Sequence, residues 1–142
     1  MKYFRLAVLA MLMSLNAGAA SLITEAEARL PDASAVRARS ITRGPAIRVI
    51  SPDPATATRS PFNFKLAFEA RGGAKIVPDS VRVSYLKTPA VDLLERIRPG
   101  ISEQGIDLAG AVVPPGEHQI QMSVEDSEGR RTTTVIKLSV VK

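Results

Sequence analysis

The side chains best suited to chemistry lie in PPGEHQIQMSVEDSEGR, residues 114–130, which contains the only histidine of the chain. A histidine can act as a general base when a nucleophile and an orienting acid stand beside it, but no serine here lies in a nucleophile motif. It can also bind zinc, which takes three or four ligands, yet the chain has no cysteine. We therefore expect no catalytic residue and no zinc. His118 shares the parity of Ile120 and Met122, which predicts a half-buried, neutral, hydrogen-bonded imidazole near the start of a strand.

The acidic cluster EDSEG, residues 125–129, could in principle bind calcium, which takes six to eight oxygen ligands. Calcium loops space their acids more regularly than this segment does. A hairpin turn explains the same residues: Asp126 would accept backbone amides two residues on, and Gly129 would take the left-handed conformation. Arg130 and Arg131 would then neutralise the acids. The pattern favours a hairpin, and we expect no metal and no cofactor.

These residues must be positioned by strands, because apolar and polar side chains alternate along much of the chain. The clearest run places its aromatic and aliphatic residues on one face and Asn63, Lys65 and Glu69 on the other. Turn residues separate the runs, including Pro78–Ser80 before one strand and Pro114–Gly116 before another. Clean alternation between such turns predicts antiparallel sheets packed face to face, an all-β sandwich. The expected strands are 46–50, 62–70 (with Phe62, Phe64, Leu66, Phe68 and Ala70 inward), 81–85, 119–124 and 134–140.

The segment KTPAVDLLERIRPG, residues 87–100, breaks the alternation and predicts a short helix. Asp92 could cap it with Glu95 at the third position. The apolar side chains Leu93, Leu94 and Ile97 would lie on one side. In a sandwich, this is a crossover from one sheet to the other, with leucines that fill the open end of the core. The alternative is a ligand-facing loop, because binding residues often lie in irregular connections on a rigid scaffold.

Two surfaces could bind a partner, the crossover and an edge strand. Strand 46–50 is guarded as an edge by Pro45, an outward Arg48 and Pro52, since unguarded edges pair with other chains. The crossover combines apolar side chains with arginine, a mixture enriched at interfaces. We therefore predict Arg96 and Arg98 as contact residues, with Leu94 as a possible anchor. If all three apolar residues fill the core, only Glu95, Arg96 and Arg98 remain exposed.

The N-terminus has the pattern of a secretory signal peptide over residues 1–19. Lys2 and Arg5 precede an apolar stretch that ends in AGA, residues 17–19, which predicts cleavage before Ala20 or, as a second choice, before Ser21. The apolar stretch is too short and too weak to span a bilayer. We therefore expect a periplasmic or extracellular protein with no membrane span in its mature form.

Residues 20–45 are expected to form a short helix and a linker. Thr24 and Glu27 fit a capping box, and Glu25 precedes Arg29 by four residues. Pro31 should end the helix. Isolated helices of this length are marginal, so this one must be either frayed or docked on another part of the molecule.

The composition of the chain argues against a nucleic-acid partner and for a single core without disulfides. Removal of Lys2 and Arg5 lowers the net charge from +5 to about +3, and the remaining basic residues are not clustered. Aromatic residues make up 4% of the chain. Nucleic-acid surfaces combine clustered Lys and Arg with stacking aromatics, so no nucleic-acid partner is expected. Without cysteine the fold has no disulfides, and the mature length suits one core, which we place in residues 46–142.

The motifs IVPDSVRVSY (76–85) and PPGEHQIQMSVEDSEGR (114–130), followed by a closing Thr/Val strand, resemble bacterial immunoglobulin-like domains of exported and surface proteins. The resemblance covers about residues 45–142 and implies a single immunoglobulin-like sandwich. The chain departs from the commoner members as a single module with a longer, helix-prone crossover. The resulting hypothesis is a secreted, non-enzymatic module for protein–protein interaction or an envelope accessory role, with an envelope protein or polymer as partner. The alternative is a carbohydrate-binding module, which usually stacks sugars on exposed aromatics; of the two tyrosines one lies in the signal peptide.

Overall fold

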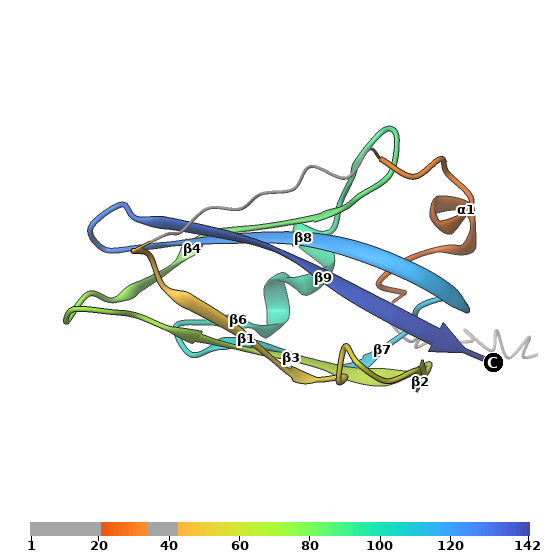
Figure 1. The fold of residues 1–142 in the computed structure, drawn as a ribbon, viewed down its shortest axis with the longest axis horizontal. Coiled ribbons are helices and arrows are strands. Elements are labelled where there is room, and N and C mark those ends of the chain that lie inside the picture. Colours follow the sequence, from red (N-terminus) through yellow and green to blue (C-terminus); the bar gives the residue numbers. More distant parts are fainter. Residues whose placement is uncertain (1–20, 34–42) are drawn as a thin grey trace, which may run out of the picture.

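The computed structural model describes residues 21–33 and 43–142, which form two β-sheets packed face to face (Figure 1). The four-stranded sheet has the order β1-β3-β7-β6, and the five-stranded sheet has the order β2-β9-β8-β4-β5. The prediction of an all-β sandwich is therefore confirmed. The strands are β1 Ala46–Ser51, β2 Thr58–Arg59, β3 Phe62–Glu69, β4 Ile76–Tyr85, β5 Val91–Asp92, β6 Ile101–Ser102, β7 Gly105–Ala111, β8 Gly116–Asp126 and β9 Arg131–Val141. The helices are α1 Glu25–Ala28 and α2 Leu94–Ile97, and α2 runs into the 3-10 turn η1 Arg98–Gly100.

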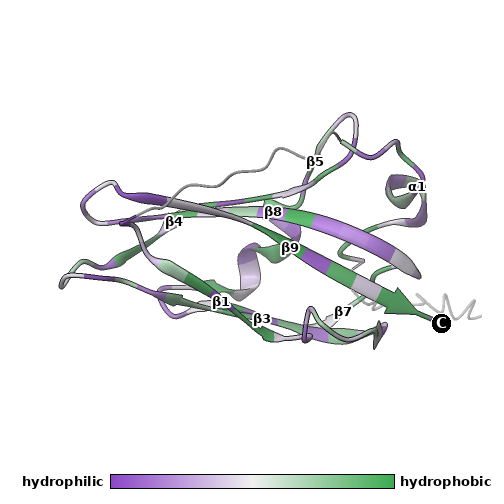
Figure 2. Ribbon diagram, in the orientation of Figure 1, coloured by the Kyte–Doolittle hydropathy of each residue, from purple (hydrophilic) through white to green (hydrophobic). Residues whose placement is uncertain are grey.

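The core lies between the sheets and follows the alternation of the sequence. Along β3 the buried and exposed side chains alternate as expected, with Phe64 fully buried and Lys65 exposed. On β9 the same alternation appears as successive hydrophobic and hydrophilic bands in Figure 2. Ala70 is a correction: β3 ends at Glu69, and Ala70 is exposed instead of inward. The residues that meet in the core from the two sheets include Phe62, Phe64, Leu66, Phe68, Val81, Val83, Tyr85, Ile120, Met122, Ile136 and Leu138.

The sheets are not wholly antiparallel, because β2 pairs with the end of β9 in parallel. Strand β7 was missed from sequence, and the reason is its composition, GIDLAGA, in which small residues hide the alternation. One of these small residues is required by packing. A Cβ at Gly105 would lie 1.9 Å from the carbonyl oxygen of Leu66, so only glycine lets β7 approach β3 at this point.

Residues 78–80 were expected to form a turn, and the structure corrects this. They lie inside β4, where the pairing with β8 shifts register between Val77 and Arg82. The Ser80 hydroxyl donates to the carbonyl of Val77 at 2.6 Å and accepts from the amide of Glu125 at 2.8 Å. Its side chain thus bonds backbone groups on both strands where their pairing is interrupted.

The hairpin between β8 and β9 has the predicted turn. One oxygen of Asp126 accepts the amides of Glu128 and Arg130, both at 3.0 Å, and Gly129 has φ of 77°. The other oxygen accepts the Arg130 guanidinium at 2.8 Å. Burial alone would raise the pKa of Asp126, but the two amides and the guanidinium outweigh it, so the pKa lies below its usual range. The carboxylate is therefore fully bound within the hairpin.

The N-terminal segment, residues 21–33, is docked on the sandwich. The predicted capping box is present, since the amide of Glu27 donates to the Thr24 hydroxyl at 3.2 Å and the amide of Thr24 donates to Glu27 at 3.0 Å. Leu22 and Ile23 are each 1% exposed and belong to the core. The amide of Leu22 donates to the carbonyl of Val112 at 2.9 Å, just beyond β7. The core therefore draws side chains from before residue 46 as well.

Candidate functional site

The crossover carries the chain from the five-stranded to the four-stranded sheet, as predicted. Strand β5, inside the crossover, pairs with β4, and strand β6, directly after it, pairs with β7. Figure 1 shows α2 between the two layers. Leu93 and Ile97 are fully buried and fix the crossover to the core. The capping prediction needs correction: Leu93 occupies the N-cap position, and Asp92 accepts the amide of Leu94 at 2.9 Å from one residue earlier.

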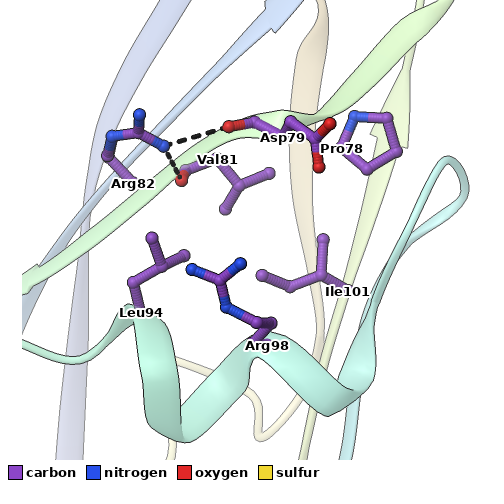
Figure 3. A pocket seen from close by; sticks show the side chains of 7 residues that line it. All are labelled: Pro78, Asp79, Val81, Arg82, Leu94, Arg98 and Ile101. Atoms are coloured by element: carbon purple, nitrogen blue, oxygen red, sulfur yellow. Dashed lines mark hydrogen bonds between the residues drawn. The ribbon is translucent and has the colours of Figure 1, made fainter.

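Two of the three predicted contact residues, Leu94 and Arg98, line one pocket of about 310 Å³ between the crossover and β4. Leu94 is half-buried and rests against the core. The Arg98 side chain is 60% exposed and forms an ion pair with Glu95 at 2.6 Å. Figure 3 shows the Arg98 guanidinium between Leu94 and Ile101, directed toward β4. We call this site the crossover pocket.

The opposite wall of the crossover pocket comes from the irregular part of β4. Val81 supplies an apolar floor, and Pro78 and Asp79 lie at one end. One nitrogen of the Arg82 guanidinium donates to the carbonyls of Asp79 and Val81 at 3.0 and 2.9 Å. Sequence reasoning missed Arg82 and Asp79, because their segment was interpreted as a turn and a plain strand. Both residues lie where the pairing of β4 with β8 shifts register, between Val77 and Arg82.

Arg96 does not belong to this pocket. Its guanidinium binds both carboxylate oxygens of Glu27, at 2.7 and 3.0 Å, and also donates to the carbonyl of Leu22 at 3.0 Å. Arg96 therefore holds the N-terminal segment on the crossover. Neighbouring arginines that the sequence placed together have different environments: Arg98 lines a pocket, and Arg96 is bound within the chain.

The Glu27–Arg96 pair is partly shielded from water. The side chain of Glu27 is 16% exposed and that of Arg96 is 34% exposed. Hydrogen bonds from Arg96 lower the pKa of Glu27 to about 2, against the opposing effect of burial. Because the pKa of Glu27 is lower in the folded chain, its ionised carboxylate stabilises the fold at pH values above its ordinary pKa of 4.5. This contribution is lost as the pH falls from 4.5 toward 2.

We expect Glu27→Gln to lower the free energy of unfolding by about 1–2 kcal/mol, because Arg96 keeps its charge and loses its charged partner. Chemical denaturation at neutral pH measures the change. Glu25→Gln is the matched control. Its pair with Arg29 spans 3.9 Å between exposed side chains, so the cost should stay under about 0.5 kcal/mol. Equal costs for the two variants would show that the N-terminal segment is not held by Glu27.

His118 is hydrogen-bonded on the inner face of β8, near its start, as predicted, and the structure adds Tyr85 as a buried partner. It is more deeply buried than expected, at 3% exposure. Its Nε2 donates to the carbonyl of Pro114 at 2.7 Å, so Nδ1 must be the acceptor of the Tyr85 hydroxyl, also at 2.7 Å. Lys87 lies over the Tyr85 ring and pairs with Asp32 of the N-terminal segment. Both imidazole nitrogens are thus bound within the fold.

Acidification should destabilise the protein through His118. Burial lowers the pKa of His118 below its ordinary value of 6.5. The unfolded chain then takes up a proton before the folded chain does, so stability is complete above pH 6.5 and declines as the pH falls below it. One proton limits the slope to about 1.4 kcal/mol per pH unit. Melting at pH 7.5 and pH 5.5 should show the loss, and His118→Gln, which removes the only histidine, should abolish most of it. An equally steep loss in this variant would contradict the assignment.

Three other kinds of feature would indicate a different function: a metal site, an aromatic platform for a sugar and a membrane-spanning helix. Residues 21–33 and 43–142 contain no group of three or more His, Cys, Asp or Glu side chains able to hold a metal ion. The aromatic side chains in these ranges, Phe62, Phe64, Phe68 and Tyr85, are all buried, so they form no platform for a sugar. Within the same ranges, no helix has the length and hydrophobicity needed for a bilayer crossing.

No family model, curated protein or solved structure matches this chain. The function is therefore inferred from the geometry of the crossover pocket.

Proposed function

We propose that the chain is an exported, non-enzymatic, immunoglobulin-like module that binds an envelope protein at the crossover pocket. The strand order supports the immunoglobulin-like assignment. Immunoglobulin domains place strands A, B, E and D in one sheet and C, F and G in the other. When the main strands are lettered A to G along the chain, the spatial order β1-β3-β7-β6 becomes A-B-E-D and the spatial order β9-β8-β4 becomes G-F-C. Strands β2 and β5 are short additions at the edges of the second sheet.

The observation that carries the binding proposal is the composition and position of the crossover pocket. Half-buried Leu94 and Ile101 and the guanidinium groups of Arg82 and Arg98 line one concavity. Arginine is enriched at protein interfaces, and the buried centre of an interface is more apolar than the rest of the surface. The volume of about 310 Å³ lies at the lower end of the range for ligand pockets, about 300–1,000 Å³, and suits a protruding side chain.

Two further observations support the remaining parts of the proposal. Export is supported by the basic and apolar N-terminal sequence with its small residues at 17–19, so the partner is sought in the cell envelope. The non-enzymatic assignment is supported by the only histidine, whose two ring nitrogens are bound to Tyr85 and Pro114, so that neither nitrogen is free to contact a substrate.

Site-directed photo-cross-linking in cells tests the proposal. A photoreactive p-benzoylphenylalanine in place of Glu95, whose side chain is 78% exposed beside Arg98, should form a discrete adduct with one envelope protein. The matched control replaces Glu69, which pairs with Arg48 at 2.9 Å on the four-stranded sheet and is 51% exposed. Adducts from position 69 and none from position 95 would contradict the proposal.

A further inference from the structure

The crossover pocket has positive groups on two facing walls and a negative group at one end, and this arrangement indicates the chemistry of its ligand. Arg82 is held by two main-chain carbonyls. These neutral acceptors orient its guanidinium without neutralising its positive charge. No carboxylate among residues 21–33 and 43–142 forms an ion pair with it. Arg98 on the facing wall has Glu95 as its one ion-pair partner within the described part of the chain, and both of these side chains are exposed. Such exposed pairs are weak and exchange readily with a competing anion.

Asp79 gives the pocket a second, negative end. It lines the pocket beside Pro78, and in Figure 3 its carboxylate lies at the Pro78 end, apart from the Arg98 guanidinium. Its carboxylate forms no ion pair among the described residues. A ligand with several negative charges would meet repulsion at this end, whereas a ligand with one carboxylate would not. An amide N–H placed near Asp79 would instead be favoured as a hydrogen-bond donor.

The floor between these two ends is apolar. Val81 is fully buried, and Leu94 and Ile101 are partly buried against the core. An aliphatic group that covers this floor would gain free energy from burial. A phosphate group or a uronic acid polymer has no such group to offer, whereas a peptide carries carboxylate, aliphatic side chain and amide within two residues.

From this arrangement we infer that the crossover pocket recognises an acidic side chain preceded by an aliphatic residue on a protein partner. The carboxylate binds between Arg82 and Arg98, the aliphatic side chain covers Leu94 and Ile101, and a main-chain amide faces Asp79. This inference rests on the proposed function, since it names the chemistry of the partner at the same site.

The test is an NMR titration of the full mature chain with the peptide N-acetyl-leucyl-glutamate amide, observed on the methyl groups of Leu94 and Ile101. We expect saturable shifts at these methyls. The isosteric N-acetyl-leucyl-glutamine amide should bind about tenfold more weakly, because it lacks the charge that the arginines recognise. Inorganic phosphate should leave the two methyls unmoved.

Arg82→Gln should weaken binding of the acidic peptide about tenfold, and Arg48→Gln on the other sheet should leave it unchanged. Melting temperatures of both variants establish that they remain folded. Equal binding of the two peptides, equal shifts with phosphate, or no shift up to the solubility limit would each overturn the inference. Cross-linking at position 95 without a preference for the acidic peptide would leave the proposed function standing and reject this inference alone.

Discussion

Phe64→Ala should lower the free energy of unfolding by about 3–5 kcal/mol. The Phe64 ring is fully buried between the sheets, and its removal leaves a cavity that neighbouring side chains fill only partly. A domain of this kind has about 5–15 kcal/mol of stability in total, so the variant should be close to unfolding at physiological temperature. Denaturant titration followed by circular dichroism measures the loss.

Lys65→Ala is the matched control for this prediction. Lys65 is the next residue on β3 and points away from the core. Its removal should cost under about 0.5 kcal/mol. If the two variants unfolded at the same denaturant concentration, the assignment of the inner face of β3 would be wrong.

Leu22→Ala should lower the free energy of unfolding by about 2–5 kcal/mol, an effect expected of a core residue and not of a terminal tail. Leu22 is 1% exposed, and its amide and carbonyl bind Val112 and Arg96. The substitution removes buried side-chain volume and leaves these backbone bonds available. Thermal and chemical denaturation of the variant and the parent protein measure the effect.

Arg29→Ala, seven residues later in the same segment, provides the comparison. Its side chain is 82% exposed and its pair with Glu25 is long, so we expect a cost below about 0.5 kcal/mol. A Leu22→Ala variant as stable as Arg29→Ala would mean that residues 21–33 do not pack on the sandwich in solution.

The elements that were predictable from sequence are those whose signal is local. Alternation along residues 62–69 specified the inner face of β3, and Asp126 with Gly129 specified the hairpin because that turn is closed by bonds among adjacent residues. The capping box of α1 was predictable for the same reason. In each case the pattern that indicates the structure lies within a few consecutive residues.

The elements that were missed depend on contacts between distant residues. Strand β7 has no strong alternation, and its place is set by the close approach of Gly105 to Leu66. Arg96 and Arg98 were equivalent in sequence, and the contacts that distinguish Arg96 come from the N-terminal segment, including Glu27, 69 residues before it. Arg82 lines the crossover pocket at the end of a register shift between β4 and β8, which depends on the pairing of two distant strands. No pattern within a short window of sequence carries this information.

The central claim is that the crossover pocket is the partner-binding surface, and one affinity comparison tests it most directly. The protein that cross-links at position 95 is titrated with Arg98→Glu and with Arg48→Glu, two charge reversals at exposed Arg–Glu pairs on different sheets. Both variants should melt within a few degrees of the parent, since exposed pairs contribute little to stability. The account predicts that Arg98→Glu weakens binding about tenfold or more and that Arg48→Glu binds like the parent. Equal affinities for the two variants would contradict it.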